Sequence, residues 1–210
     1  MSDETNPLDE LSLVGGRLIL DFTNTIGSRG VVNERDRLKG YPELLWWGVR
    51  AEVLTEGERR ALMAHAVKRS AEAEDAFRRA IDFREASWRV LRAVEDGADP
   101  DAADLDTVNR EVARAMSHAR LVRTAEGFAW GWDDALEADR VLWPVARSAA
   151  ELLTSPELGR VGRCAAESCG WLYLDTSKNR SRRWCDMRDC GNRAKVRRHY
   201  QRRRVGEGEG

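Results

Sequence analysis

Apolar residues recur every three to four positions from about residue 41 to residue 119, which is the period of helices with one buried face. Each of these stretches follows a helix-start signal, such as a proline in the first turn, a capping box or an Asp-Pro-Asp turn. The pattern predicts helices that begin at Tyr41-Pro42, Thr55, Ser70 and Asp101. Gly97 should end the third of them. We interpret the apolar stripes as the core of a helical bundle and not as a cofactor site.

The period changes after residue 120, where apolar and polar residues alternate. Residues 121–124 and 128–132 flank a turn at Gly127, which is typical of a β-hairpin with its tryptophans on one face. Because two strands alone are marginally stable, we expect this hairpin to lie on the helices. A last helix is expected from Asp134 to about Thr154, bent at Pro144.

Near the N-terminus, Gly15-Gly16 leads into an apolar run that fits either a buried strand or a short helix. Three polar residues at its end, Asp21, Asn24 and Thr25, would need hydrogen-bond partners if they were buried. They could line a ligand pocket, or they could cap Arg37 or backbone groups at a helix end. We favour the structural role.

All four cysteines of the chain stand in two pairs with four intervening residues, Cys164/Cys169 and Cys185/Cys190. Two short chelating loops brought together by a hairpin readily supply the four thiolates of a structural zinc site. Residues 171–174 are predicted to form one strand, 175–179 the turn and 182–184 the returning strand, followed by a helix over 193–204 that Asn192 caps. Disulfides and a redox dithiol are the alternatives, but cytosolic thiols stay reduced and a redox pair usually has two intervening residues. We expect bound Zn²⁺ with no open position for catalysis.

Charge is distributed unevenly, although the whole chain has a net charge of −1. Residues 160–204 contain 14 Lys and Arg residues against 4 acidic ones, whereas residues 1–159 carry a net charge of −9. A basic segment attached to an acidic body is typical of a nucleic-acid-binding module. The candidate phosphate contacts are the cationic residues around the expected metal site: Arg182, Arg183, Arg193, Lys195, Arg197 and Arg198. A solvated basic tail, an RNA-binding module and a module that docks an acidic protein are the alternatives.

The cysteine pairs, together with residues 175–177, 182–185 and 190–195, resemble the CGNR zinc finger, which is named for the four residues that stand here at 190–193. Tyr173 departs from this pattern, because phenylalanine is more frequent at that position. Residues 15–25 resemble the signature that opens the ABATE domain, with Thr23 in place of valine. Proteins that combine the two modules are regarded as stress-induced transcription regulators that bind DNA through the finger.

The resemblance implies a mainly α (α+β) protein with two domains. Residues 1–157 would form an ABATE-like, mainly helical sensor domain with a small β-hairpin, and residues 160–204 a finger made of a hairpin and a C-terminal helix. The Gly/Glu-rich tail, residues 205–210, is expected to be disordered.

Catalytic constellations are missing from the sequence. The three histidines lie far apart on predicted helices, and neither a nucleophile elbow nor a phosphate-cradling glycine motif occurs. We therefore expect a protein that is not an enzyme. The chain also lacks a signal peptide and a transmembrane run, so we expect a cytoplasmic location without membrane contact. DNA is the expected partner; a small-molecule ligand of the N-terminal domain and a homodimer are further hypotheses.

Overall fold

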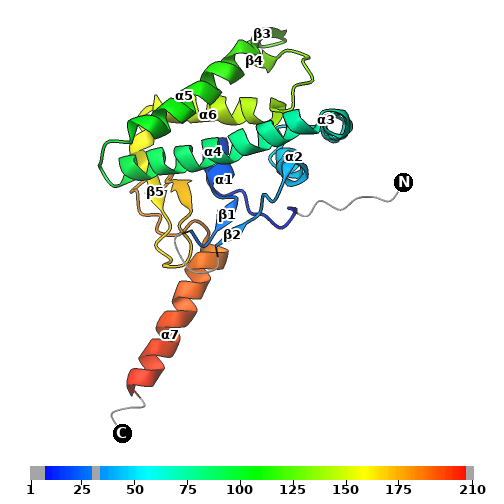
Figure 1. Cartoon of the computed structure of the whole chain (residues 1–210). Coiled ribbons are helices and arrows are strands. Elements are labelled where there is room, and N and C mark those ends of the chain that lie inside the picture. Colours follow the sequence, from blue (N-terminus) through cyan, green and yellow to red (C-terminus); the bar gives the residue numbers. More distant parts are fainter. Residues whose placement is uncertain (1–7, 30–33, 207–210) are drawn as a thin grey trace.

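The computed structural model describes residues 8–29 and 34–206. At its centre is the short helix α1 (Leu18–Thr23), in which Ile19, Leu20 and Phe22 are fully buried. The bundle around it consists of α2 (Tyr41–Arg50), α3 (Glu56–Lys68), α4 (Ser70–Glu95), α5 (Ala102–Ser117) and α6 (Trp143–Leu153) (Figure 1). Helices α4 and α6 pack directly on α1. The mainly α (α+β) class is thus confirmed, and residues 18–23 adopt the helical one of the two conformations considered.

The helix-start signals act where the sequence places them. Thr55 and Glu58 form a capping box at the start of α3, in which the Thr55 hydroxyl accepts from the Glu58 amide and the Glu58 carboxylate accepts from the Thr55 amide. The Asp101 carboxylate accepts a 2.8 Å hydrogen bond from the Ala103 amide at the start of α5. Pro42 occupies the first turn of α2, where its missing N–H has no cost.

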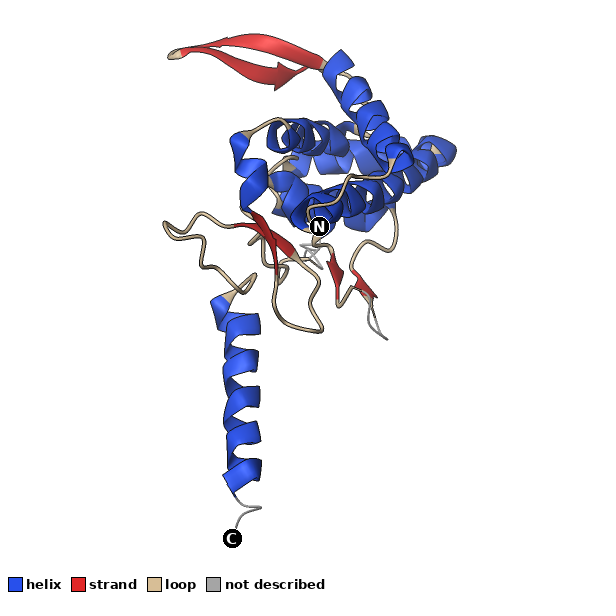
Figure 2. Ribbon diagram, turned by 90° about the vertical axis from the view of Figure 1, so that its left-hand side faces the viewer, coloured by secondary structure: helices blue, strands red, loops and turns tan. Residues whose placement is uncertain are grey.

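The predicted β-hairpin is present but does not lie on the helices along its length. Strands β3 (Ala119–Thr124) and β4 (Gly127–Trp132) pair in antiparallel fashion and project from the bundle (Figure 2). Trp132 at the base packs near Trp143 of α6, with ring centroids 5.9 Å apart, whereas Phe128 near the tip is 70% exposed. Arg147 of α6 also lies over the Trp130 ring at 5.6 Å, so the half of the hairpin near the bundle gains the support that we expected for the whole.

The helix expected over residues 134–154 begins later than predicted. A 3-10 turn (Arg140–Leu142) leads into α6 at Trp143, so Pro144 lies in the first helical turn and bends nothing. Asp139 explains the difference, because its carboxylate accepts from the Trp143 indole and forms a 2.7 Å ion pair with Arg79 of α4. These contacts hold the residues before Trp143 against the bundle in a non-α-helical conformation.

The strand pairing of the C-terminal part also differs from the prediction. Strand β6 (Leu172–Leu174) pairs with β5 (Val161–Arg163), which follows a 3-10 turn at Pro156–Arg160, and not with residues 182–184. Val161, Leu172 and Leu174 belong to the same apolar core as the bundle. Burial of these side chains in the bundle thus selects the upstream partner. A second small pair, β1 (Ile26–Gly27) and β2 (Arg35–Asp36), lies nearby.

After the last cysteine the chain forms one long helix that extends away from the body. A π-helical turn (Met187–Gly191) continues into α7 (Asn192–Gly206), which makes the lower arm in Figures 1 and 2. Asn192 has helical dihedral angles and is not the cap that we predicted; Asp186 accepts from the Arg188 amide and starts the turn instead. Helix α7 includes residues 205 and 206 of the tail that we expected to be disordered, and residues 207–210 lie outside the described part.

No helix in the described ranges, 8–29 and 34–206, is both long and apolar enough to cross a membrane.

Candidate metal centre and nucleic-acid interface

Four cysteine sulfurs converge at the base of α7. The Sγ atoms of Cys164, Cys169, Cys185 and Cys190 all lie within 4.8 Å of one another, and all four residues are buried. The Cys169–Cys185 and Cys185–Cys190 sulfurs are each 3.6 Å apart, far beyond the ~2.05 Å of a disulfide. Four Zn–S bonds of ~2.3 Å in a tetrahedron place sulfurs ~3.8 Å apart, so the donor set fits a four-thiolate metal site.

Backbone contacts bring the two chelating loops together. The Cys164 amide donates to Trp171 O at 2.9 Å, and the Ala165 amide donates to Arg183 O at 2.8 Å, which joins the first loop to the segment before Cys185. Gly191 allows close packing, because a Cβ there would lie 2.8 Å from Met187 Sδ and 3.2 Å from the Trp184 ring. A larger residue at this position would require the Met187 side chain to move.

Electrostatics in the cluster also favour a cation. Hydrogen bonds from the Cys169 and Cys185 thiols lower the pKa of Cys164, and the same contacts with Cys164 raise the pKa of Cys169 and of Cys185. Without a cation, the four sulfurs cannot all be thiolates at this distance, because their charges repel one another. A divalent metal removes that penalty, so its binding is coupled to proton release.

The metal-binding segment is docked on the body by hydrogen bonds to backbone groups of both parts. Asn24, which follows α1, makes two of them: its amide nitrogen donates to Leu172 O at 2.8 Å and its amide oxygen accepts from Leu172 N at 3.0 Å. The Trp171 indole donates to Ile26 O at 2.7 Å, and the Leu174 amide donates to Gly15 O at 2.7 Å. The finger and the helical body therefore form one packed structure.

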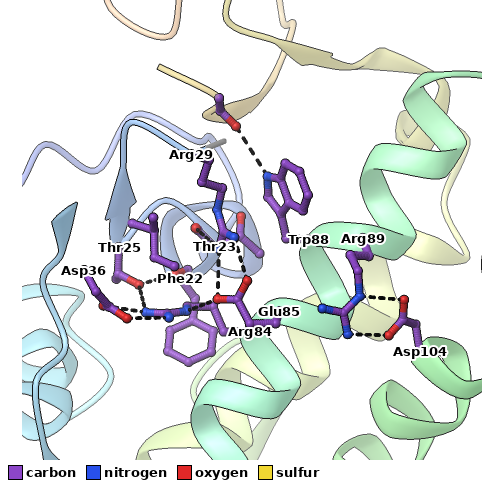
Figure 3. A network of polar contacts seen from close by, with 12 residues as sticks. Phe22, Thr23, Thr25, Arg29, Asp36, Arg84, Glu85, Trp88, Arg89 and Asp104 are labelled. Atoms are coloured by element: carbon purple, nitrogen blue, oxygen red, sulfur yellow. Dashed lines mark hydrogen bonds and ion pairs between the residues drawn. The ribbon is translucent and has the colours of Figure 1, made fainter. Parts of the chain in front are cut away.

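A buried ionic network supports the same contact from the body side (Figure 3). Arg29 and Arg84 converge on Glu85, and the Arg84 guanidinium also forms a bidentate pair with Asp36 at 2.7 and 2.8 Å. The Arg29 amide donates to Cys169 O, and the Trp88 indole donates to Gly170 O. The backbone of the first chelating loop is thus held directly by the body.

The three polar residues of the N-terminal signature are all engaged in this framework. Thr25 Oγ1 donates to Phe22 O and accepts from Arg84, and Asp21 Oδ1 accepts from the Gly15 amide at 2.8 Å. Burial raises the pKa of Asp21 to about 6, against the opposing effects of the Gly15 amide and of the Arg182 charge. Together with the contacts of Asn24, these bonds correspond to the structural role that we favoured.

Arg182 differs from the other candidate phosphate contacts, because its guanidinium faces inward. It donates to the carbonyl oxygens of Val14, Leu174, Trp184 and Cys185 and lies over the Tyr173 ring at 4.4 Å. The Tyr173 hydroxyl in turn donates to Arg182 O at 2.6 Å, a bond that phenylalanine could not make. Arg182 thus links the finger to the body through four of its five guanidinium N–H groups.

The remaining candidates, Arg183, Arg193, Lys195, Arg197 and Arg198, are exposed. Arg193 donates to Asp189 at 3.2 Å and to Cys190 Sγ at 3.0 Å, and the bond to sulfur raises the pKa of Arg193. Arg197 forms a 2.7 Å ion pair with Glu167 in the first chelating loop. Two apolar or aromatic residues of α7, Val196 and Tyr200, are also exposed.

Two acidic residues of this surface were overlooked in the sequence. Glu167 and Asp189 each pair with an arginine of α7, although no role was predicted for either of them beyond the net charge of the segment. Their position between the paired cysteines, inside a strongly basic segment, was the available signal. Asp175 is a third such residue, because its carboxylate accepts from the Ser177 and Arg182 amides and fixes the turn.

Comparison with protein families gives two matches along the chain. Residues 16–156 match the ABATE family, described as "Putative stress-induced transcription regulator", and residues 160–203 match the CGNR zinc finger. A comparison with curated proteins found no match. The two matched segments include the docking residues of α1 and all four cysteines. The chain belongs to the ABATE family and carries a C-terminal CGNR zinc finger.

Proposed function

We propose that this protein is a zinc-dependent, DNA-binding transcription regulator with no catalytic role, and that α7 and the adjoining metal centre contact the DNA. The observation that carries the proposal is the arrangement of α7 (Figure 2), a basic helix that extends into solvent from a rigid cluster of four buried sulfurs. An isolated helix of this length is marginally stable in water, so contact with a partner would stabilise it. The description of the ABATE family supports a regulatory role.

Zinc is the metal that the donor set favours. The four ligands are thiolates without a carboxylate or water position, and four-sulfur tetrahedral sites select zinc or iron–sulfur chemistry. When bound, zinc would hold Cys164, Cys169, Cys185 and Cys190 together and fix the direction in which α7 leaves the body. The segment has little apolar core of its own around the cysteines, so this fixation should depend on the metal.

The size and charge of α7 suit the major groove of DNA. Its fifteen residues span about 22 Å, and the major groove is wide enough to admit one helix. Arg193, Lys195, Arg197 and Arg198 are exposed on its first turns, next to the body, where the phosphates that border a groove would lie. Arg183 extends this basic surface on the other side of Trp184, whose ring lies 5.5 Å from its guanidinium.

Affinity measured over a salt series tests the proposal. A duplex selected by the metal-loaded protein from a random pool should bind with a log affinity that falls linearly with log salt. Changing Arg193→Ala together with Arg197→Ala should reduce that slope by about 0.9 for each lost phosphate contact. The matched control, Arg60→Ala with Arg78→Ala, changes two exposed arginines of the body and should leave the slope unchanged. An equal slope in the α7 variant and wild type would contradict the assignment of this surface.

RNA binding or docking of an acidic protein is the competing function, because the same cationic surface serves either. Retention of duplex RNA but not DNA, or of a protein without any nucleic acid, would favour it. Sensing of a small molecule and pairing of two copies stay predictions from the sequence. The exposed aromatic side chain of Phe128 on the β3–β4 hairpin, at the end of the body remote from α7, is compatible with such pairing (Figure 1).

A further inference from the structure

A groove separates the first chelating loop from the start of α7. It has a volume of about 210 Å³ and is lined by residues 165–168 on one side and by α7 on the other. Arg193, Arg197 and Arg198 all contribute to the helix side, and Trp184 and Cys190 contribute to the floor. Three guanidinium groups beside one short loop make this groove strongly basic.

The three arginines are not equivalent. Arg193 donates to Cys190 Sγ and to Asp189, and a four-thiolate zinc site would carry about two net negative charges that keep it there. Arg198 has no ion pair within the described residues. Arg197 is the one that reaches across the groove, where its Nη1 lies 2.7 Å from Glu167 Oε2. Glu167 is therefore the acidic residue of the groove that pairs with one of its arginines.

The Arg197–Glu167 pair is of a kind that exchanges readily. Both side chains are exposed, at 59% and 84%, and such pairs contribute at most about 1 kcal/mol. A phosphate offers more negative charge and further acceptor oxygens, and Arg binds it in bidentate geometry. The backbone of the loop that carries Glu167 is nevertheless held by hydrogen bonds, because the Ala165 amide donates to Arg183 O and the Cys169 amide donates to Ala166 O. The loop backbone is thus held beside α7, and the Glu167 carboxylate lies against Arg197 where a phosphate oxygen could lie.

We propose that this groove binds one phosphate of a DNA strand through Arg197 and Arg198, and that Glu167 occupies the phosphate position in the free protein. The inference rests on the proposed DNA-binding function and names the chemistry of one contact within it. Glu167 must leave Arg197 before the phosphate enters, so it lowers affinity for every DNA sequence equally. Contacts to bases are unaffected by this competition, and a weaker backbone contribution makes the protein more dependent on them.

A double-mutant cycle on DNA affinity tests the proposal. Glu167→Gln keeps the shape of the side chain and removes its charge, and it should raise affinity about two- to fivefold, which corresponds to an exposed ion pair of up to ~1 kcal/mol. In the Arg197→Ala background the same change should have little effect, because Arg197 is the cation of the groove with which Glu167 pairs. Glu126→Gln, at the exposed turn of the β3–β4 hairpin, is the matched control for the change in net charge.

The outcomes separate this inference from the function on which it rests. If wild type binds DNA but Glu167→Gln gains no more than Glu126→Gln, or gains equally with and without Arg197, the competition does not exist. If metal-loaded wild type binds no DNA, the proposed function and this inference both fall. Metal content and far-UV circular dichroism should be unchanged in Glu167→Gln, since the side chain is exposed and holds no buried group.

Discussion

The two hydrogen bonds of Asn24 provide the sharpest stability test of how the finger is attached. Asn24 is 1% exposed and Leu172 is fully buried, and the Asn24 amide satisfies both backbone groups of Leu172. Asn24→Ala leaves the Leu172 N–H and C=O without partners in the core, where water cannot replace them. Each buried orphan costs about 1–3 kcal/mol, so the free energy of unfolding should fall by about 2–6 kcal/mol. That is a large part of the ~5–15 kcal/mol typical of a whole domain.

Urea denaturation of the metal-loaded protein, followed by tryptophan fluorescence and far-UV circular dichroism, measures this loss. The transition midpoint should move to lower urea with little change in slope, because the variant exposes a similar surface on unfolding. Asn109→Ala, an exposed change on α5, is the matched control and should have almost no effect.

Asn24→Asp adds a second, pH-dependent test. An ionised carboxylate accepts from Leu172 N–H but repels Leu172 O, whereas a protonated one can donate to that oxygen as the amide does. Relative to wild type at the same pH, Asn24→Asp should therefore be less destabilised at pH 4–5 than at pH 7. A loss below about 1 kcal/mol in Asn24→Ala, or one equal to that of Asn109→Ala, would refute the docking role of Asn24.

Two further predictions follow from the groups around the same contact. Because burial raises the pKa of Asp21 from 3.8 to about 6, the folded protein binds more protons than the unfolded chain in that window, and its stability falls as pH rises through it. Asp21→Asn keeps an acceptor for the Gly15 amide, so it should be more stable than wild type above pH 6 by about 1–3 kcal/mol and equal to it near pH 4. Thermal melts of both proteins across this pH range measure the difference, and a variant less stable than wild type above pH 6 would contradict the prediction. Cys185→Ser should lower metal content below one ion per chain and expose the peptide bonds of the chelating loops and of α7 to hydrogen exchange, while those of α4 stay protected; full retention of metal would exclude Cys185 as a ligand.

Local signals in the sequence were enough to predict most helices and the composition of the metal site. Capping residues and apolar periodicity depend on neighbours in the chain, so the box at Thr55 and the cap at Asp101 could be identified directly. The spacing of the cysteine pairs has the same local character. The family match and the cluster of four buried sulfurs agree with that interpretation.

Features that depend on distant partners could not be predicted in the same way. Strand β6 pairs with β5 because the bundle core buries Leu172 and Leu174, and Asn24 lies 148 residues away from Leu172 in the chain. The late start of α6 has a similar cause, since the contacts of Asp139 with α4 and with Trp143 outweigh helical continuation. The inward direction of the Arg182 side chain could not be predicted for a related reason. Its four carbonyl acceptors are brought together only by the fold, and the sequence shows just one more cation in a basic segment.

The central claim is that a metal held by sulfur fixes a basic helix in a position from which it binds DNA. The most direct test is fluorescence anisotropy of the selected duplex, titrated with metal-loaded protein, with chelated protein and with protein to which zinc has been returned, at several salt concentrations. We expect salt-sensitive binding that chelation abolishes and zinc restores, because α7 is no longer held in a fixed direction without the ion. Equal affinity in the loaded and the chelated protein would contradict it.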